Sequence, residues 1–289
     1  MLKSLCIKVN NKNVADYLLK SFQKVDLCNI CISKHKFKLY NNIIIHYTGE
    51  EIDSFFDIIA NTLSNVIIDF YELKIIEHII NSNYFYFTNL EQEKILNICK
   101  EDIKNAEEKE LLIKKDSIFL SCLDYFNNNK SLILDGFVNF RLTNYIKILD
   151  VITDIAVNKF VIDREYSEFI DLLKMYISSK ECGINIVHLI YNQPESILLD
   201  EFKNVINLDN NILNSKYLSD ITFSSNDYAL NTLLTLLPQV IYIHIIDIED
   251  EFINTLKLIF DDRVYICNDC SICKIYRLEK IKKEQNFFN

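Results

Sequence analysis

The sequence predicts an α+β fold, with an N-terminal mixed α/β part, a central helical segment and a C-terminal, partly parallel sheet flanked by helices. Short alternating apolar stretches mark strands near the start, and apolar residues spaced by three or four fill the middle. After Gly183, strand and helix patterns take turns, as in a sheet with crossover helices. We therefore expect three regions, at 1–88, 89–182 and 183–289.

The N-terminal region begins with an alternating strand at 2–9, followed by a short amphipathic helix at 14–22. Residues 36–47 read as two strands joined at Asn41–Asn42, a pair that tolerates the positive φ of a tight hairpin. These patterns predict a mixed α/β part.

Two capping boxes predict helix starts, one at Thr48 with Glu51 and the other at Thr88 with Glu91. Residues 100–116 then form a charge run, which is typical of a solvated helix face.

The long central helix is expected to follow 132–137, with Asp135 as its N-cap and a core stripe from Val138 to Phe160. Asp163 is expected to cap a second helix.

The pattern of the C-terminal region predicts alternating strands and helices. Two strands at 184–191 and 196–200 flank a turn at 192–194. Ser224 and Asp227 predict a helix that stops at Pro238. A strand at 240–246, a helix opening at Asp247 and a last strand at 263–267 complete the order.

Composition limits the classes of function. The chain has 289 residues, 49% of them hydrophobic, and a formal net charge of −10, which disfavours nucleic-acid binding. We find no signal peptide and no apolar run of the ~18 residues that a membrane span needs. The nine cysteines are then most simply reduced thiols of a cytoplasmic protein. With three glycines in all, no window can form a glycine-rich phosphate loop.

Three thiols stand at a spacing of three in the stretch "VYICNDCSIC": Cys267, Cys270 and Cys273. A C-x2-C pair is half of many zinc sites, but no second well-placed pair completes it. A redox dithiol is a further alternative, and inert thiols are the interpretation that the sequence favours. "CNIC", with Cys28 and Cys31, is interpreted as small buried residues in a strand.

His188 and His244 both lie late in predicted parallel strands. Because ligands bind at the carboxyl edge of such sheets, these imidazoles and the three cysteines could form one site, with ligands suited to zinc. The simpler alternative is two core histidines with backbone or carboxylate partners.

Two further groups of polar residues suggest contacts. Arg141, with Glu165 and Tyr166 on the next predicted helix, is interpreted as an inter-helix ion pair. The basic C-terminal tail suits either a helix that docks on a partner or a frayed, solvated end.

The stretch from Asp135 to Ile177, together with "INIVHLI" and "DRVYICNDCSIC", resembles the YtxC-like family of sporulation proteins from endospore-forming bacteria. The residues that carry the resemblance within the first stretch are Gly136, Phe137, Phe140, Arg141, Leu142, Tyr145, Glu165, Tyr166, Phe169, Ile170, Leu172 and Leu173. The resemblance implies a soluble protein of sporulation without an established activity, brings no catalytic residues, and makes the three cysteines a family feature.

We therefore expect a non-enzymatic sporulation protein that acts through interaction with an unknown protein partner. The alternative is a metal- or thiol-dependent enzyme with its site at the carboxyl edge of the C-terminal sheet.

Overall fold

The computed structural model describes residues 3–24, 29–193, 195–206, 224–246 and 250–278. It is an α+β fold, as predicted, and it divides into two compact units, Met1–Asp163 and Arg164–Asn289. The expected division into three regions stays a prediction. None of the helices in the described ranges is long and apolar enough to cross a membrane.

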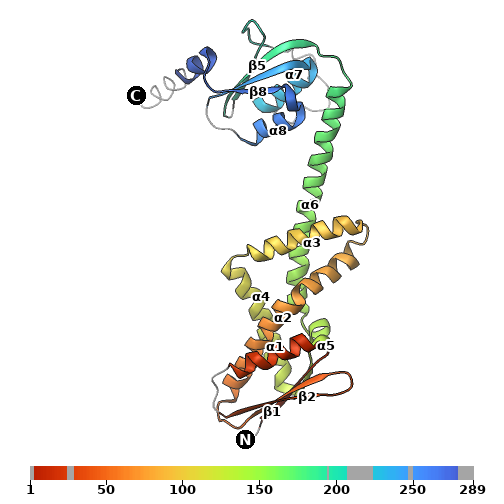
Figure 1. Cartoon of the computed structure of the whole chain (residues 1–289). Coiled ribbons are helices and arrows are strands. Elements are labelled where there is room, and N and C mark those ends of the chain that lie inside the picture. Colours follow the sequence, from red (N-terminus) through yellow and green to blue (C-terminus); the bar gives the residue numbers. More distant parts are fainter. Residues whose placement is uncertain (1–2, 25–28, 194, 207–223, 247–249, 279–289) are drawn as a thin grey trace. The chain divides into compact units, whose positions relative to one another are not determined.

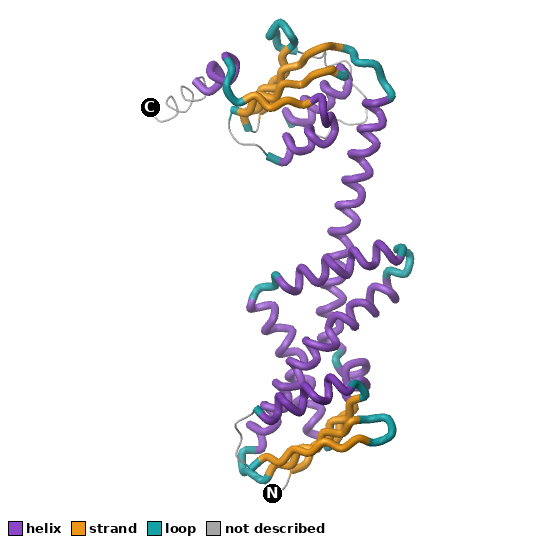
Figure 2. Tube along the Cα trace, viewed as in Figure 1, coloured by secondary structure: helices purple, strands orange, loops and turns teal. Residues whose placement is uncertain are grey.

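A four-stranded sheet in the first unit has the order β2-β3-β1-β4 (Figures 1 and 2). Its strands are β1 (Lys3–Val9), β2 (Ile30–Lys36), β3 (Asn41–Tyr47) and β4 (Ser131–Ile133). β1 pairs antiparallel with β3 and parallel with β4. The predicted alternation is confirmed, because Leu5, Ile7 and Val9 are buried together with the apolar face of α1 (Lys12–Gln23).

Helices make up the rest of this unit: α2 (Ile52–Asn83), α3 (Asn89–Lys104), α4 (Glu108–Asn128), α5 (Leu134–Arg141) and the first part of α6 (Thr143–Ser178). The capping box of α3 is confirmed, since Thr88 accepts from the backbone of Glu91 and the Glu91 carboxylate accepts from the backbone of Thr88.

Inside this bundle, one carboxylate joins three helices. Glu72 of α2 accepts hydrogen bonds from Lys114 Nζ of α4, at 2.9 Å, and from Tyr145 OH of α6, at 2.5 Å. All three side chains are buried. The expectation that the charge run at 100–116 is a solvated face is therefore wrong at Lys114, and the run is also interrupted between α3 and α4.

The second unit contains the other sheet, of order β6-β5-β7-β8. Its strands are β5 (Ile184–Asn192), β6 (Glu195–Leu199), β7 (Pro238–Ile245) and β8 (Val264–Cys267). β5, β7 and β8 are parallel and β6 is antiparallel to β5, so the predicted partly parallel sheet is confirmed.

The two faces of this sheet differ. α7 (Ser225–Leu236) and α8 (Glu251–Phe260) share a core with one face, through residues such as Leu189 and Ile243. The other face carries a smaller cluster, in which Ile190 of β5 and Leu199 of β6 pack with the helix at 271–278. That helix contributes Ile272 and Cys273. The predicted capping box at Ser224 and Asp227 is present.

Several local predictions about strands and helix starts are wrong. The hairpin between β2 and β3 turns at 37–40, where Phe37 N donates to Tyr40 O at 2.9 Å, and Asn41 already belongs to β3. Thr48 does not cap α2, because its N–H and hydroxyl both donate to Asn29 O. Cys31 is exposed rather than buried, and Cys28 lies outside the described residues.

Other errors concern aspartates that were expected to cap helices. Asp135 lies in the first turn of α5 and accepts a hydrogen bond from Tyr71 OH. Asp163 starts no helix, because α6 runs through it without a glycine or proline to end it. Asp250 caps α8, where it accepts from Phe252 N and Ile253 N, whereas Asp247 lies outside the described residues.

Candidate metal centre

β7 and β8 bring a histidine next to a cysteine. The parallel register pairs His244, near the carboxyl end of β7, with Cys267, the last residue of β8. The chain then bends at 268–270 and enters the helix at 271–278, whose first turns contain Cys273. Four ligand-type residues are thus collected from two adjacent strand ends, a bend and a helix.

The donor atoms of His244, Cys267, Cys270 and Cys273 all lie within 4.8 Å of one another. The Nδ1 atom of His244 is 3.3 Å from Cys273 Sγ and 3.4 Å from Cys270 Sγ. Cys273 Sγ is 3.6 Å from Cys270 Sγ and 3.9 Å from Cys267 Sγ. His244 and Cys273 are buried, and Cys267 and Cys270 are half-buried.

His188 lies outside this group of four and directly behind His244. Its Nδ1 is 3.0 Å from His244 Nε2, the ring nitrogen that faces away from the cysteines. If His244 Nδ1 binds a metal, the proton of the ring must sit on Nε2, which then donates to His188 Nδ1. The structure therefore gives His188 the position of a residue that orients a ligand.

Both imidazoles are biased toward the neutral form. Burial lowers the pKa of His244 to about 4, assisted by the charges of His188 and Lys203. Burial and Lys203 also lower the pKa of His188, while Asp200 opposes them. A neutral imidazole has a free lone pair, so His244 can act as a ligand at neutral pH.

The thiols have unequal acidities. Burial, followed by hydrogen bonds with Cys270 and Cys273, raises the pKa of Cys267 to about 11. Burial also acts to raise the pKa of Cys270, but hydrogen bonds from backbone N–H groups at Cys273 and Ile272 and with the two other thiols outweigh it and lower this pKa. Of these two thiols, Cys270 is the better prepared to become a thiolate.

The sequence left open whether the basic tail forms a helix and did not place Cys273 in one. The structure has a helix at 271–278, which determines where Cys273 lies. Its signal was the spacing of Ile272, Cys273 and Tyr276, which join the small cluster on this face of the sheet. Arg277 Nη2 donates to Ile245 O at 3.4 Å and adds a contact between this helix and β7.

The other predicted site residues are separate from this group. Arg141 ends α5 in the first unit. Glu165 and Tyr166 lie within α6 in the second unit, where Tyr166 OH is 2.9 Å from Thr255 Oγ1 of α8. The role proposed for them stays a prediction, as does metal binding by the cysteines and histidines.

Comparison with known proteins gives one family. A model of the YtxC-like family matches residues 57–265, a range that includes both histidines and ends before Cys267. The Uncharacterized protein YtxC of Bacillus subtilis (strain 168) is 24% identical over 204 residues, which cover 68% of this chain and 72% of that protein. No solved structure matches significantly. Since the family match spans more than half of the sequence, the chain belongs to the YtxC-like family.

Proposed function

We propose that this chain is a zinc-binding protein of sporulation that acts through protein interactions. The main support for a bound metal ion is the spacing of the four donor atoms. A tetrahedral zinc ion with Zn–S bonds of ~2.3 Å and a Zn–N bond of ~2.0 Å keeps its ligand atoms roughly 3.5–3.8 Å apart. Four of the six separations between these atoms, from 3.3 to 3.9 Å, are close to these values, and the other two are within 4.8 Å.

The donor set selects the metal and its role. Zinc binds well to thiolate and imidazole ligands such as these four, whereas the hard cations Mg²⁺ and Ca²⁺ prefer oxygen ligands. Four protein ligands fill the tetrahedral shell and leave no position for water or substrate, which is the pattern of a structural zinc site. The ion would hold β8 and the helix at 271–278 against the end of β7.

The sequence resemblance supports a role in sporulation. The family that the sequence resembles is one of sporulation proteins, and the chain belongs to the YtxC-like family, with 24% identity to the relative from Bacillus subtilis. A structural zinc site supports an interaction role because it stabilises a surface and performs no reaction by itself.

One observation favours a second candidate, a dithiol redox enzyme. Cys270, whose pKa is lowered, directly precedes the helix at 271–278, and Cys273 Sγ is 3.6 Å away. In that function Cys270 thiolate would attack a substrate disulfide, and Cys273 would then release the reduced substrate as two thiols while Cys270 and Cys273 form a disulfide.

Metal analysis after anaerobic purification separates the two candidates. Zinc bound at one ion per chain, and lost in Cys270→Ser, supports the zinc protein. Zinc-free chain that reduces a model disulfide, with loss of that activity in Cys270→Ser, supports the enzyme. For the process, a Bacillus subtilis strain without its YtxC relative would receive this chain or Cys270→Ser. We expect only the unmodified chain to restore heat-resistant spores, and no spore defect in the deletion strain would contradict the sporulation role.

A further inference from the structure

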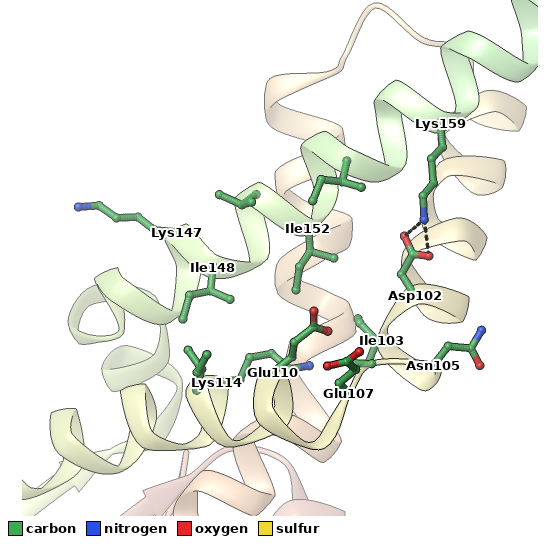
Figure 3. Close-up of a pocket in the computed structure, with 14 residues that line it drawn as sticks. Asp102, Ile103, Asn105, Glu107, Glu110, Lys114, Lys147, Ile148, Ile152 and Lys159 are labelled. Atoms are coloured by element: carbon green, nitrogen blue, oxygen red, sulfur yellow. Dashed lines mark hydrogen bonds and ion pairs between the residues drawn. The ribbon is translucent and has the colours of Figure 1, made fainter.

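A pocket of about 700 Å³ lies in the first unit, between the end of α3, the first turns of α4 and one face of α6 (Figure 3). We call it the α4–α6 groove and define it by its lining residues within 102–114 and 147–159. The α6 wall runs from Lys147 to Lys159, a length of about 18 Å at 1.5 Å per residue. That length equals roughly three turns of a second helix.

The walls of the groove are aliphatic and open to solvent. Val151 and Ile155 on α6 are 57% and 49% exposed, and Ile113 on α4 is 50% exposed. Single exposed aliphatic residues are common, but several that line one hollow indicate a docking surface. Pockets for small molecules enclose most of their ligand, whereas this half-exposed wall suits a peptide that covers it from outside.

Some charged side chains that line the groove form ion pairs and others do not. Lys114 is neutralised by Glu72 at 2.9 Å, and Lys159 by Asp102 at 2.7 Å. Across the described ranges of the chain, the carboxylates of Glu107 and Glu110 have no hydrogen bond or ion pair.

Figure 3 shows these two carboxylates close together on the α4 side of the groove, while the ammonium group of Lys147 points away from them. An occupant therefore meets an aliphatic wall and two unpaired negative charges.

From the aliphatic wall, its length and these charges, we propose that the α4–α6 groove binds a basic amphipathic helix of a partner protein. Apolar side chains spaced by three or four along the partner helix would pack on Val151, Ile152 and Ile155. Its Lys or Arg side chains would pair with Glu107 and Glu110. This inference rests on the proposed interaction role and states the chemistry of the partner.

The test uses the full chain, loaded with zinc, and two labelled synthetic peptides of about 15 residues. Both peptides carry Leu at helical spacing on one face, and one has Lys where its twin has Glu. By fluorescence anisotropy we expect the Lys peptide to bind at micromolar concentration, at least tenfold more tightly than the Glu twin. Because exposed ion pairs are screened, the difference should shrink at high salt.

Matched variants locate the binding. The double variant Glu107→Gln with Glu110→Gln should bind the Lys peptide roughly fivefold more weakly, as expected for the loss of two exposed ion pairs. Glu101→Gln with Glu108→Gln removes the same charge at exposed residues outside the lining and should have no such effect. Val151→Asp should abolish binding, whereas Ile162→Asp, at another exposed position of α6, should not.

Three results would overturn the groove as the docking site. They are equal binding of the two peptides, equal effects of the groove and control variants, and unchanged binding by Val151→Asp. Each is distinct from failure of the zinc proposal, because Cys270→Ser tests zinc in the other unit and should leave peptide binding unchanged. Circular dichroism of each variant checks that the fold is retained.

Discussion

Replacement of Cys270 by Ser gives the sharpest test of the metal centre. The change removes one of four ligands and replaces a thiolate by a hydroxyl, which is a poor zinc ligand at neutral pH. A serine is close in size to cysteine, and Cys270 is half-buried, so the loss of packing is small. The main expected effect is therefore on zinc and on the elements that zinc would join.

The magnitude follows from linkage between binding and folding. A ligand present at 100 to 1,000 times its Kd stabilises the folded state by about 2.7–4.1 kcal/mol. The proposed ion joins β7, β8, the bend at 268–270 and the helix at 271–278, all within Arg164–Asn289. For a unit of this size, about 3 kcal/mol corresponds to a decrease in Tm of roughly 10 °C.

The assay combines metal content, thiol titration and thermal unfolding of the same preparations. We expect one zinc ion per chain in the unmodified protein, little in Cys270→Ser, and a lower Tm of the second unit in that variant or after chelation. Cobalt in place of zinc should give the visible absorption of a tetrahedral thiolate site. Cys182→Ser is the matched control, since it removes an exposed thiol of the same unit.

The outcomes that refute the reasoning are specific. A zinc-free protein with nine freely titrating thiols, purified without oxygen and with zinc supplied, would falsify the metal centre. An equal loss of zinc in Cys182→Ser and Cys270→Ser would show that the ion is bound elsewhere or without specificity.

Three further predictions concern single contacts. His188→Leu should weaken zinc binding by about 10- to 100-fold, the usual effect of losing a partner of a ligand histidine, while zinc still binds at one ion per chain; competition with a chromogenic chelator measures it, and an unchanged affinity would exclude an orienting role. Lys114→Met should destabilise the first unit by about 3–5 kcal/mol in urea unfolding, because it leaves the Glu72 carboxylate buried without its cation, and adding Glu72→Gln should recover part of this loss. Gly183→Ala should cost about 1–3 kcal/mol, because an added Cβ would lie 2.6 Å from the backbone oxygen of Leu236; no change in the denaturation midpoint would contradict this clash.

The sequence predicted those parts of the fold that depend on local periodicity. The strand at the N-terminus, the strands after Gly183 and the boxes at Thr88 and Ser224 followed from alternation and capping, and the structure contains all of them. Helix starts at Asp135 and Asp163 failed, because an aspartate can equally well lie exposed within a helix or bond a distant tyrosine. Local sequence does not reveal which of these partners is available.

The candidate site was predictable only as a set of residue types. Spacing identified the three cysteines and the strand pattern identified His188 and His244, but the choice of His244 as their neighbour depends on strand register. The pairing of β7 with β8 joins segments separated by a whole helix, and a shift of one residue would turn His244 to the opposite face of the sheet. The α4–α6 groove likewise depends on packing between helices distant in sequence.

The shared carboxylate of Glu72 has a consequence for how the first unit reaches a single structure. Leucine and isoleucine contacts between helices remain favourable when one helix slides along another, so an apolar bundle has near-equivalent alternatives. Here a slide of one turn, ~5.4 Å, would separate Glu72 from Lys114 or Tyr145 and leave a charge without a partner in the interior. We expect the two contacts of Glu72 to fix the positions of α2, α4 and α6 along one another. Replacing all three residues with apolar ones would then yield a bundle that is stable but less uniquely ordered.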